Sequence, residues 1–103
     1  MMKIRKLLDI RERSIRYGSV FRVLGKWPYE PLVDFLLVYS PGCDRKSNLV
    51  VSTGHKAGLI MERLPLESSL EHGANGISTK WAISNWDEWI YPDCPIEDVF
   101  VID

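Results

Sequence analysis

Five short runs of β-forming residues, separated by turns rich in glycine and proline, most constrain the fold of this chain. The runs span residues 19–25, 32–40, 49–53, 59–64 and 98–102. Gly54 and Gly58 bound the loop between the third and fourth runs, which predicts a hairpin there. Parallel strands need crossovers of about a dozen residues or more, and only the segment 65–97 offers one. The pattern therefore predicts a mainly antiparallel sheet.

Helical signals are weaker and fall at two places. Ile4, Leu7 and Leu8 lie at helical spacing before Gly18, so this stretch fits a short amphipathic helix or a ragged strand. Ser78 precedes the sequence TKWAISNW and can cap a short helix there. A chain of 103 residues fits one domain. We predict a single α+β domain over residues 1–103, dominated by antiparallel sheet, with one or two short helices.

The most apolar strand candidates supply a candidate core. We expect one core to contain Phe35, Leu37, Val50, Ile60, Phe100 and Ile102. The four tryptophans are expected to pack in or beside this core, each with a partner for its indole N–H.

Composition and processing signals narrow the class of protein. The longest apolar run has five residues, from Phe35 to Tyr39, too few for a membrane-spanning helix. The opening sequence MMKIRKLLDIRERS has no apolar stretch of signal-peptide length, so we expect a cytoplasmic protein with no membrane partner. Cys43 and Cys94 lie far apart without near partners, which predicts free thiols and no zinc site.

Signals for catalysis are poor. His55 and His72 both lie in glycine-rich loops, and no G-x-S-x-G motif is present. The sequence STGHKAG lacks the order of a phosphate-binding loop, and a hairpin turn explains its glycines. We therefore predict no enzyme activity, no catalytic residues, no metal and no cofactor.

Charge is divided unevenly along the chain. Residues 1–61 carry eleven lysines and arginines against five acids, a net charge of +6. Residues 62–103 carry two against nine, a net charge of −7, and no base follows Lys80. We call five of the acids after Lys80 the acidic block: Asp87, Glu88, Asp93, Glu97 and Asp98. They could meet a basic partner, or could pair internally with Arg11, Arg13, Arg16 or Arg22. The basic N-terminal stretch is interrupted by Asp9 and Glu12, so nucleic acid is a disfavoured partner.

Several strings together resemble a known family. They are GSVFRV at 18–23, KWPYEPLVDFLLV at 26–38, STGHKAGLI at 52–60, RLPLES at 63–68 and KWAISNWDEWIYPDCPIEDVFVI at 80–102. In combination they resemble small tryptophan-rich immunity proteins of bacterial polymorphic toxin and contact-dependent growth-inhibition systems. The resemblance covers nearly all of the chain from Gly18 onward, and NWDEWIYPDCPIEDVFVI is its most specific piece.

The resemblance implies a non-enzymatic protein that binds and neutralises a cognate toxin C-terminal domain in the producing cell. Many toxins of these systems are nucleases with basic surfaces, which an acidic face would attract. We therefore expect the toxin contacts to include Asp87, Glu88, Asp93, Glu97 and Asp98. The family-like Trp and Gly positions are expected to be scaffold. A module for another ligand, including nucleic acid through the basic N-terminal stretch, is the alternative.

Overall fold

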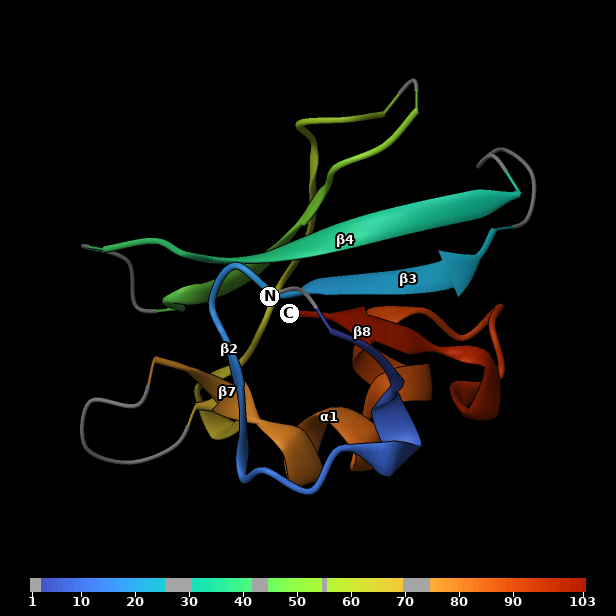
Figure 1. Cartoon of the computed structure of the whole chain (residues 1–103). Helices are drawn as coiled ribbons and strands as arrows, with labels where there is room; N and C mark the ends of the chain where they lie inside the picture. The colour runs from blue at the N-terminus through green and yellow to red at the C-terminus, as the bar shows by residue number, and fades with distance from the viewer. Residues whose placement is uncertain (1–2, 26–30, 42–44, 55, 70–74) are drawn as a thin grey trace.

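The computed structural model describes residues 3–25, 31–41, 45–54, 56–69 and 75–103, and within them the prediction of an antiparallel α+β fold is confirmed (Figure 1). The strands are β1 (Ile4–Lys6), β2 (Ser14–Arg16), β3 (Val20–Leu24), β4 (Leu32–Tyr39), β5 (Ser47–Val51), β6 (Ile60–Arg63), β7 (Gly76–Ser78) and β8 (Phe100–Ile102). The helical elements are the 3₁₀ turns η1 (Leu7–Asp9), η2 (Leu66–Ser68) and η4 (Ile96–Asp98), the helix α1 (Thr79–Ser84) and the π-helical turn η3 (Trp86–Ile90).

The main sheet has six strands in the order β1-β8-β3-β4-β5-β6, and each neighbouring pair is antiparallel. Strands β2 and β7 form a separate antiparallel pair. The two ends of the chain lie side by side (Figure 1), where the Lys3 amide donates to the Asp103 carbonyl at 2.6 Å. The long connection after β6 returns the chain from one edge of the sheet to β8, between β1 and β3.

Local signals predicted most of these elements. The five β-forming runs correspond to β3, β4, β5, β6 and β8. Ser78 does cap α1, since the Trp81 amide donates to Ser78 Oγ at 3.1 Å. Among the described residues, no helix has the length and hydropathy needed to cross a membrane.

The amphipathic helix predicted near the N-terminus is wrong, and the alternative of a ragged strand is confirmed. This stretch forms β1, η1 and β2. Strand β1 pairs with β8, and β2 pairs with β7, so long-range backbone pairing overrides the helical spacing of Ile4, Leu7 and Leu8. The three-residue strand β7 carries no sequence signal of its own and was not predicted.

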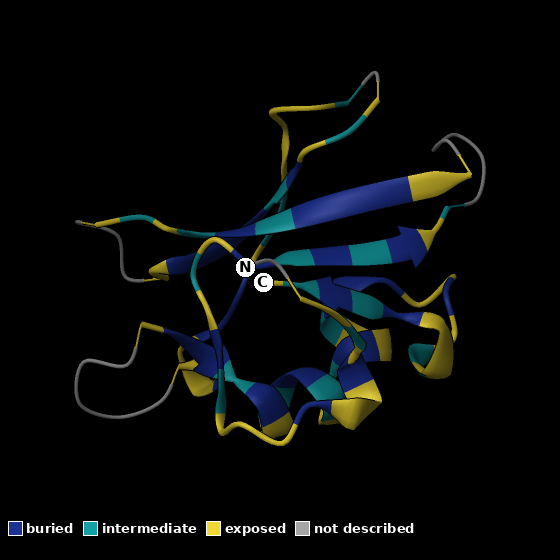
Figure 2. Ribbon diagram, viewed as in Figure 1, coloured by how far each residue is buried: buried dark blue, intermediate teal, exposed yellow. Residues whose placement is uncertain are grey.

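One face of the sheet is buried beneath the segment that joins β6 to β8. Alternate residues of β3 and β4 point into this core, among them Phe21, Val23 and Phe35, and each is at most 1% exposed. Trp86 and Tyr91 cover them from the connecting segment. Figure 2 shows the resulting alternation of half-buried and buried residues along β3, whereas β4 has three consecutive buried residues at 33–35.

Two of the six predicted core residues are correct. Phe35 and Leu37 are fully buried, as predicted. The other four residues do not lie on the buried face of the sheet. Val50, Phe100 and Ile102 are half-buried, and Ile60 is 50% exposed. Leu49 and Val51 are buried on either side of Val50, and Val99 and Val101 are buried beside Phe100 and Ile102, whereas the neighbours of Ile60 are not buried. These runs are apolar on both faces, so the period of two residues could not show which face is inside.

The two phenylalanines Phe35 and Phe100 test this assignment. We expect Phe35→Ala to lower the free energy of unfolding by about 3–5 kcal/mol, because it leaves a cavity in a close-packed core. We expect Phe100→Ala to lower it by less than half as much, because Phe100 is half-buried on the other face. Urea unfolding curves of the two variants measure both values. Equal losses would show that the face carrying Phe100 is also covered.

Candidate functional site

The acidic block is presented by the turns that follow α1. In η3, Trp86 and Ile90 point into the core while Asp87 and Glu88 are exposed. The turn is held open to π-helical width by the Tyr91 amide, which donates to the Trp86 carbonyl at 3.1 Å. Burial of Trp86 thus fixes the two carboxylates that follow it on the solvent side.

Three of the five predicted residues come together. Asp87, Asp93 and Glu97 line one shallow pocket of about 660 Å³, which also contains Leu24 at the end of β3. Its remaining lining residues are Gly25, Pro92, Pro95 and Ile96. Glu88 and Asp98 are exposed but do not line this pocket. The pocket therefore combines carboxylates with an apolar residue at the end of a central strand.

The five carboxylates form no salt bridge with any other residue that the structure describes. The carboxylates that do pair belong to other parts of the chain: Glu12 and Asp103 contact Arg5, and Asp34 contacts Arg22 at 2.8 Å. Arg22, one of the proposed internal partners, is thus engaged elsewhere. Internal pairing with Arg11, Arg13 or Arg16 is not observed in the described part of the chain either. Among the described residues, the acidic block is therefore without a salt-bridge partner.

Cys94 lies directly behind the acidic turns. It is fully buried and is a free cysteine, as predicted. Burial raises the pKa of its thiol, a backbone hydrogen bond with Leu24 opposes part of this rise, and the negative charges of Asp98 and Glu97 add smaller increases. A thiol in this environment stays protonated and unreactive at neutral pH. Cys43 lies outside the described residues.

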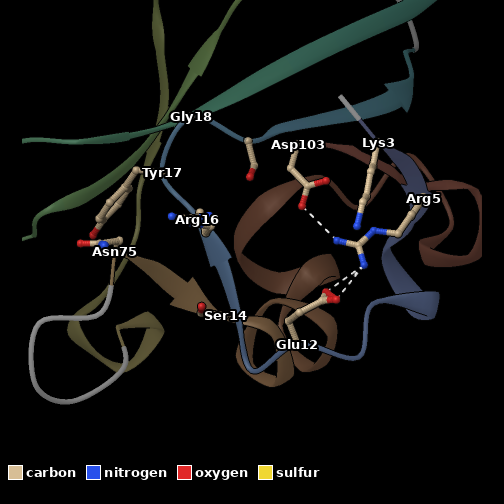
Figure 3. Close-up of a pocket in the computed structure, with 10 residues that line it drawn as sticks. Lys3, Arg5, Glu12, Ser14, Arg16, Tyr17, Gly18, Asn75 and Asp103 are labelled. Atoms are coloured by element: carbon tan, nitrogen blue, oxygen red, sulfur yellow. Dashed lines mark hydrogen bonds and ion pairs between the residues drawn. The ribbon is translucent and has the colours of Figure 1, made fainter. Parts of the chain in front are cut away.

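A second pocket, of about 720 Å³, lies beside the paired chain ends (Figure 3). Lys3 and Arg16 line it together with Arg5, which binds Glu12 at 2.9 Å and Asp103 at 3.0 Å. The Arg5 guanidinium therefore already holds two carboxylates of this chain, and it is not available to a phosphate. This arrangement gives little support to nucleic-acid binding through the N-terminal stretch.

The described tryptophans belong to the scaffold. Trp86 is 1% exposed and packs against Phe21 with ring centroids 5.6 Å apart. Trp81 and Trp89 pack against each other at 6.3 Å and are partly buried. The expected partner for each indole N–H is not found at Trp86, whose buried Nε1 has none among the described residues.

Three other residues that the sequence analysis considered lie outside the described residues: Trp27, His55 and His72. Within the described part of the chain, no group of three or more His, Cys, Asp or Glu side chains could hold a metal ion.

Comparison with known proteins gives one match. The family model described as Immunity protein 45 matches residues 7–101. This confirms the resemblance to an immunity-protein family of toxin systems and extends it toward the N-terminus, from Gly18 to Leu7. No curated protein and no solved structure matches the chain significantly.

The buried thiol behind the acidic turns provides a test of this part of the structure. In a Cys43→Ser variant, Cys94 is the only thiol, and we expect it to react with a disulfide reagent at least 100-fold more slowly in the folded protein than in urea, because its access and ionisation are both reduced. Absorbance of the released thiolate measures the two rates. Equal rates would show that the 91–98 turns do not pack as described.

Proposed function

Because the chain belongs to the Immunity protein 45 family, we propose that it binds and neutralises a cognate toxin domain in the cytoplasm of the bacterium that makes both. The toxin would be the C-terminal domain of a secreted polymorphic toxin or a contact-dependent growth-inhibition protein. Neutralisation is by binding, without catalysis by this chain and without a cofactor.

One observation supports a site for this function: the exposed carboxylates of the C-terminal block are not paired with described residues. Basic residues elsewhere in the chain do find acids, as Arg5 and Arg22 show. We assign toxin contacts to Asp87, Glu88, Asp93, Glu97 and Asp98, three of which line the same pocket.

Electrostatics explains what such a surface contributes. Uncompensated charge accelerates the encounter with an oppositely charged partner and disfavours partners of the same sign. A nuclease toxin, whose active site binds phosphates through basic residues, has the matching charge. The immunity protein would then reach the toxin quickly and compete with its substrate for the same positive surface.

Co-expression tests the function directly. We expect the toxin domain encoded beside this chain's gene to arrest growth when it is expressed alone. Growth should be restored, and the two proteins should co-purify, when this chain is also expressed. Arrest that persists despite soluble expression of this chain would contradict the proposed function.

Charge reversal tests the assigned residues. We expect Glu88→Lys and Asp93→Lys to slow association with an inactivated toxin domain about tenfold at low salt, because each removes an attraction and adds a repulsion. The loss should shrink in 1 M salt, where the Debye length falls to about 3 Å. Stopped-flow association rates at two salt concentrations measure both effects.

Glu67→Lys is the matched control, since Glu67 is an exposed carboxylate in η2, outside the acidic block. It makes the same change of charge, and we expect a much smaller effect on association. All three variants should keep the free energy of unfolding within about 0.5 kcal/mol of wild type, as is usual for surface sites. Association rates that fall equally for Glu67→Lys and Glu88→Lys would show a general effect of net charge and no local site.

A further inference from the structure

The face of the main sheet that points away from the core carries an unbroken row of aliphatic side chains. Strand pairing places six residues side by side, one from each strand, and every neighbouring pair in the row is a register pair. From one edge of the sheet to the other they are Ile4, Ile102, Val20, Leu36, Val50 and Ile60.

This row is open to solvent. Ile4 and Ile60, at the two edges, are 62% and 50% exposed, and the four residues between them are half-buried by their neighbours in the sheet. A second packed layer would bury the central members, as the connecting segment buries Phe21 and Phe35 on the opposite face. A solvated sheet face normally carries polar residues in alternation with the core.

A contiguous apolar surface on a soluble protein marks an interaction site. Neighbouring strands lie about 4.8 Å apart, so the five steps from Ile4 to Ile60 make a row about 24 Å long. The exposed pair Leu24 and Leu32 points from the same face, four residues further along β3, or about 13 Å away. The row and this pair lie on either side of Arg22 and Asp34, and both fit within an interface of about 800 Å² per partner.

We infer that this outer sheet face is the surface on which the cognate toxin domain docks, with the acidic block as its rim. The inference rests on the proposed function and deepens it. Leu24 connects the two surfaces, because it belongs to the outer sheet face and also lines the pocket of Asp87, Asp93 and Glu97. The complementary toxin surface has an apolar centre flanked by basic residues on the side that meets Leu24.

The paired charges within the face fit this role. Arg22 and Asp34 lie opposite each other on β3 and β4, next to the row, and their side chains make two hydrogen bonds, of 2.8 and 3.0 Å. The pair is neutral as a unit, so it can be covered by a partner at a lower desolvation cost than a single charge. The Asp34 side chain is only 11% exposed, so it is already largely removed from water before any partner binds.

The test compares lysine substitutions inside and outside the face. Leu36→Lys and Ile60→Lys alter the centre and the edge of the row, and Leu66→Lys is the control, since Leu66 is 65% exposed in η2. The probe is an inactivated form of the toxin domain encoded beside this chain's gene. We expect the dissociation constant to rise about 30-fold or more for Leu36→Lys, mainly through faster dissociation, and less than threefold for Leu66→Lys.

The outcomes distinguish failure of the proposed docking face from failure of the proposed toxin-neutralising function. Unchanged affinity in folded Leu36→Lys and Ile60→Lys, with wild-type binding intact, overturns the docking face and leaves the proposed function standing. Failure of the wild-type chain to bind or protect overturns both. If the lysine variants do not fold, Val20→Thr and Val50→Thr are used in their place. We expect each of these to raise the dissociation constant at least threefold. A self-associated chain that these variants dissociate without loss of toxin affinity would show that a second copy covers the face, against our inference.

Discussion

The packing of Trp86 on one face of the central strands is the contact on which the rest of this structure depends. Its ring lies against Phe21, and Tyr91, five residues later, lies against Phe35 on the neighbouring strand. Together they hold the connecting segment to β3 and β4. The segment then delivers β8 to its place between β1 and β3, so the order of the sheet follows from this attachment. The buried indole N–H that lacks a described partner is a cost that the contact outweighs.

Because the connecting segment covers one face of the main sheet, it leaves the opposite face without a second layer among the described residues. The long segment that joins β6 to β8 supplies a second layer, and its buried described residues, among them Ile77, Ala82 and Trp86, belong to the core. The outer face remains open, although its strands carry Val20, Leu36 and Val50 there. The same attachment turns Asp87 and Glu88 toward water, because Trp86 and Ile90 occupy the inward positions of η3. One packing contact therefore determines both the apolar and the acidic parts of the exposed surface.

The sequence predicted the elements better than it predicted their faces. Runs bounded by glycine and proline located the main strands, and the hydroxyl of Ser78 located the start of α1. The buried face could not be predicted, because Leu49 and Val50, or Phe100 and Val101, are equally apolar neighbours, and only tertiary packing decides between them. The short strands β1, β2 and β7 exist through their pairing partners and have no local signal. The acidic residues were identified from composition, but only geometry shows which of them share a pocket.

An immunity protein faces two separate physical demands, and the two exposed surfaces answer them differently. A cognate toxin must be captured before it acts, and long-range charge accelerates capture. Charge at an exposed rim adds little to the lifetime of a complex, because water and salt screen it at contact. Burial of apolar surface is insensitive to such screening and slows dissociation. In the proposed interface, an acidic rim that meets an aliphatic sheet face at Leu24 would therefore combine fast encounter with long residence, which neither surface would provide alone.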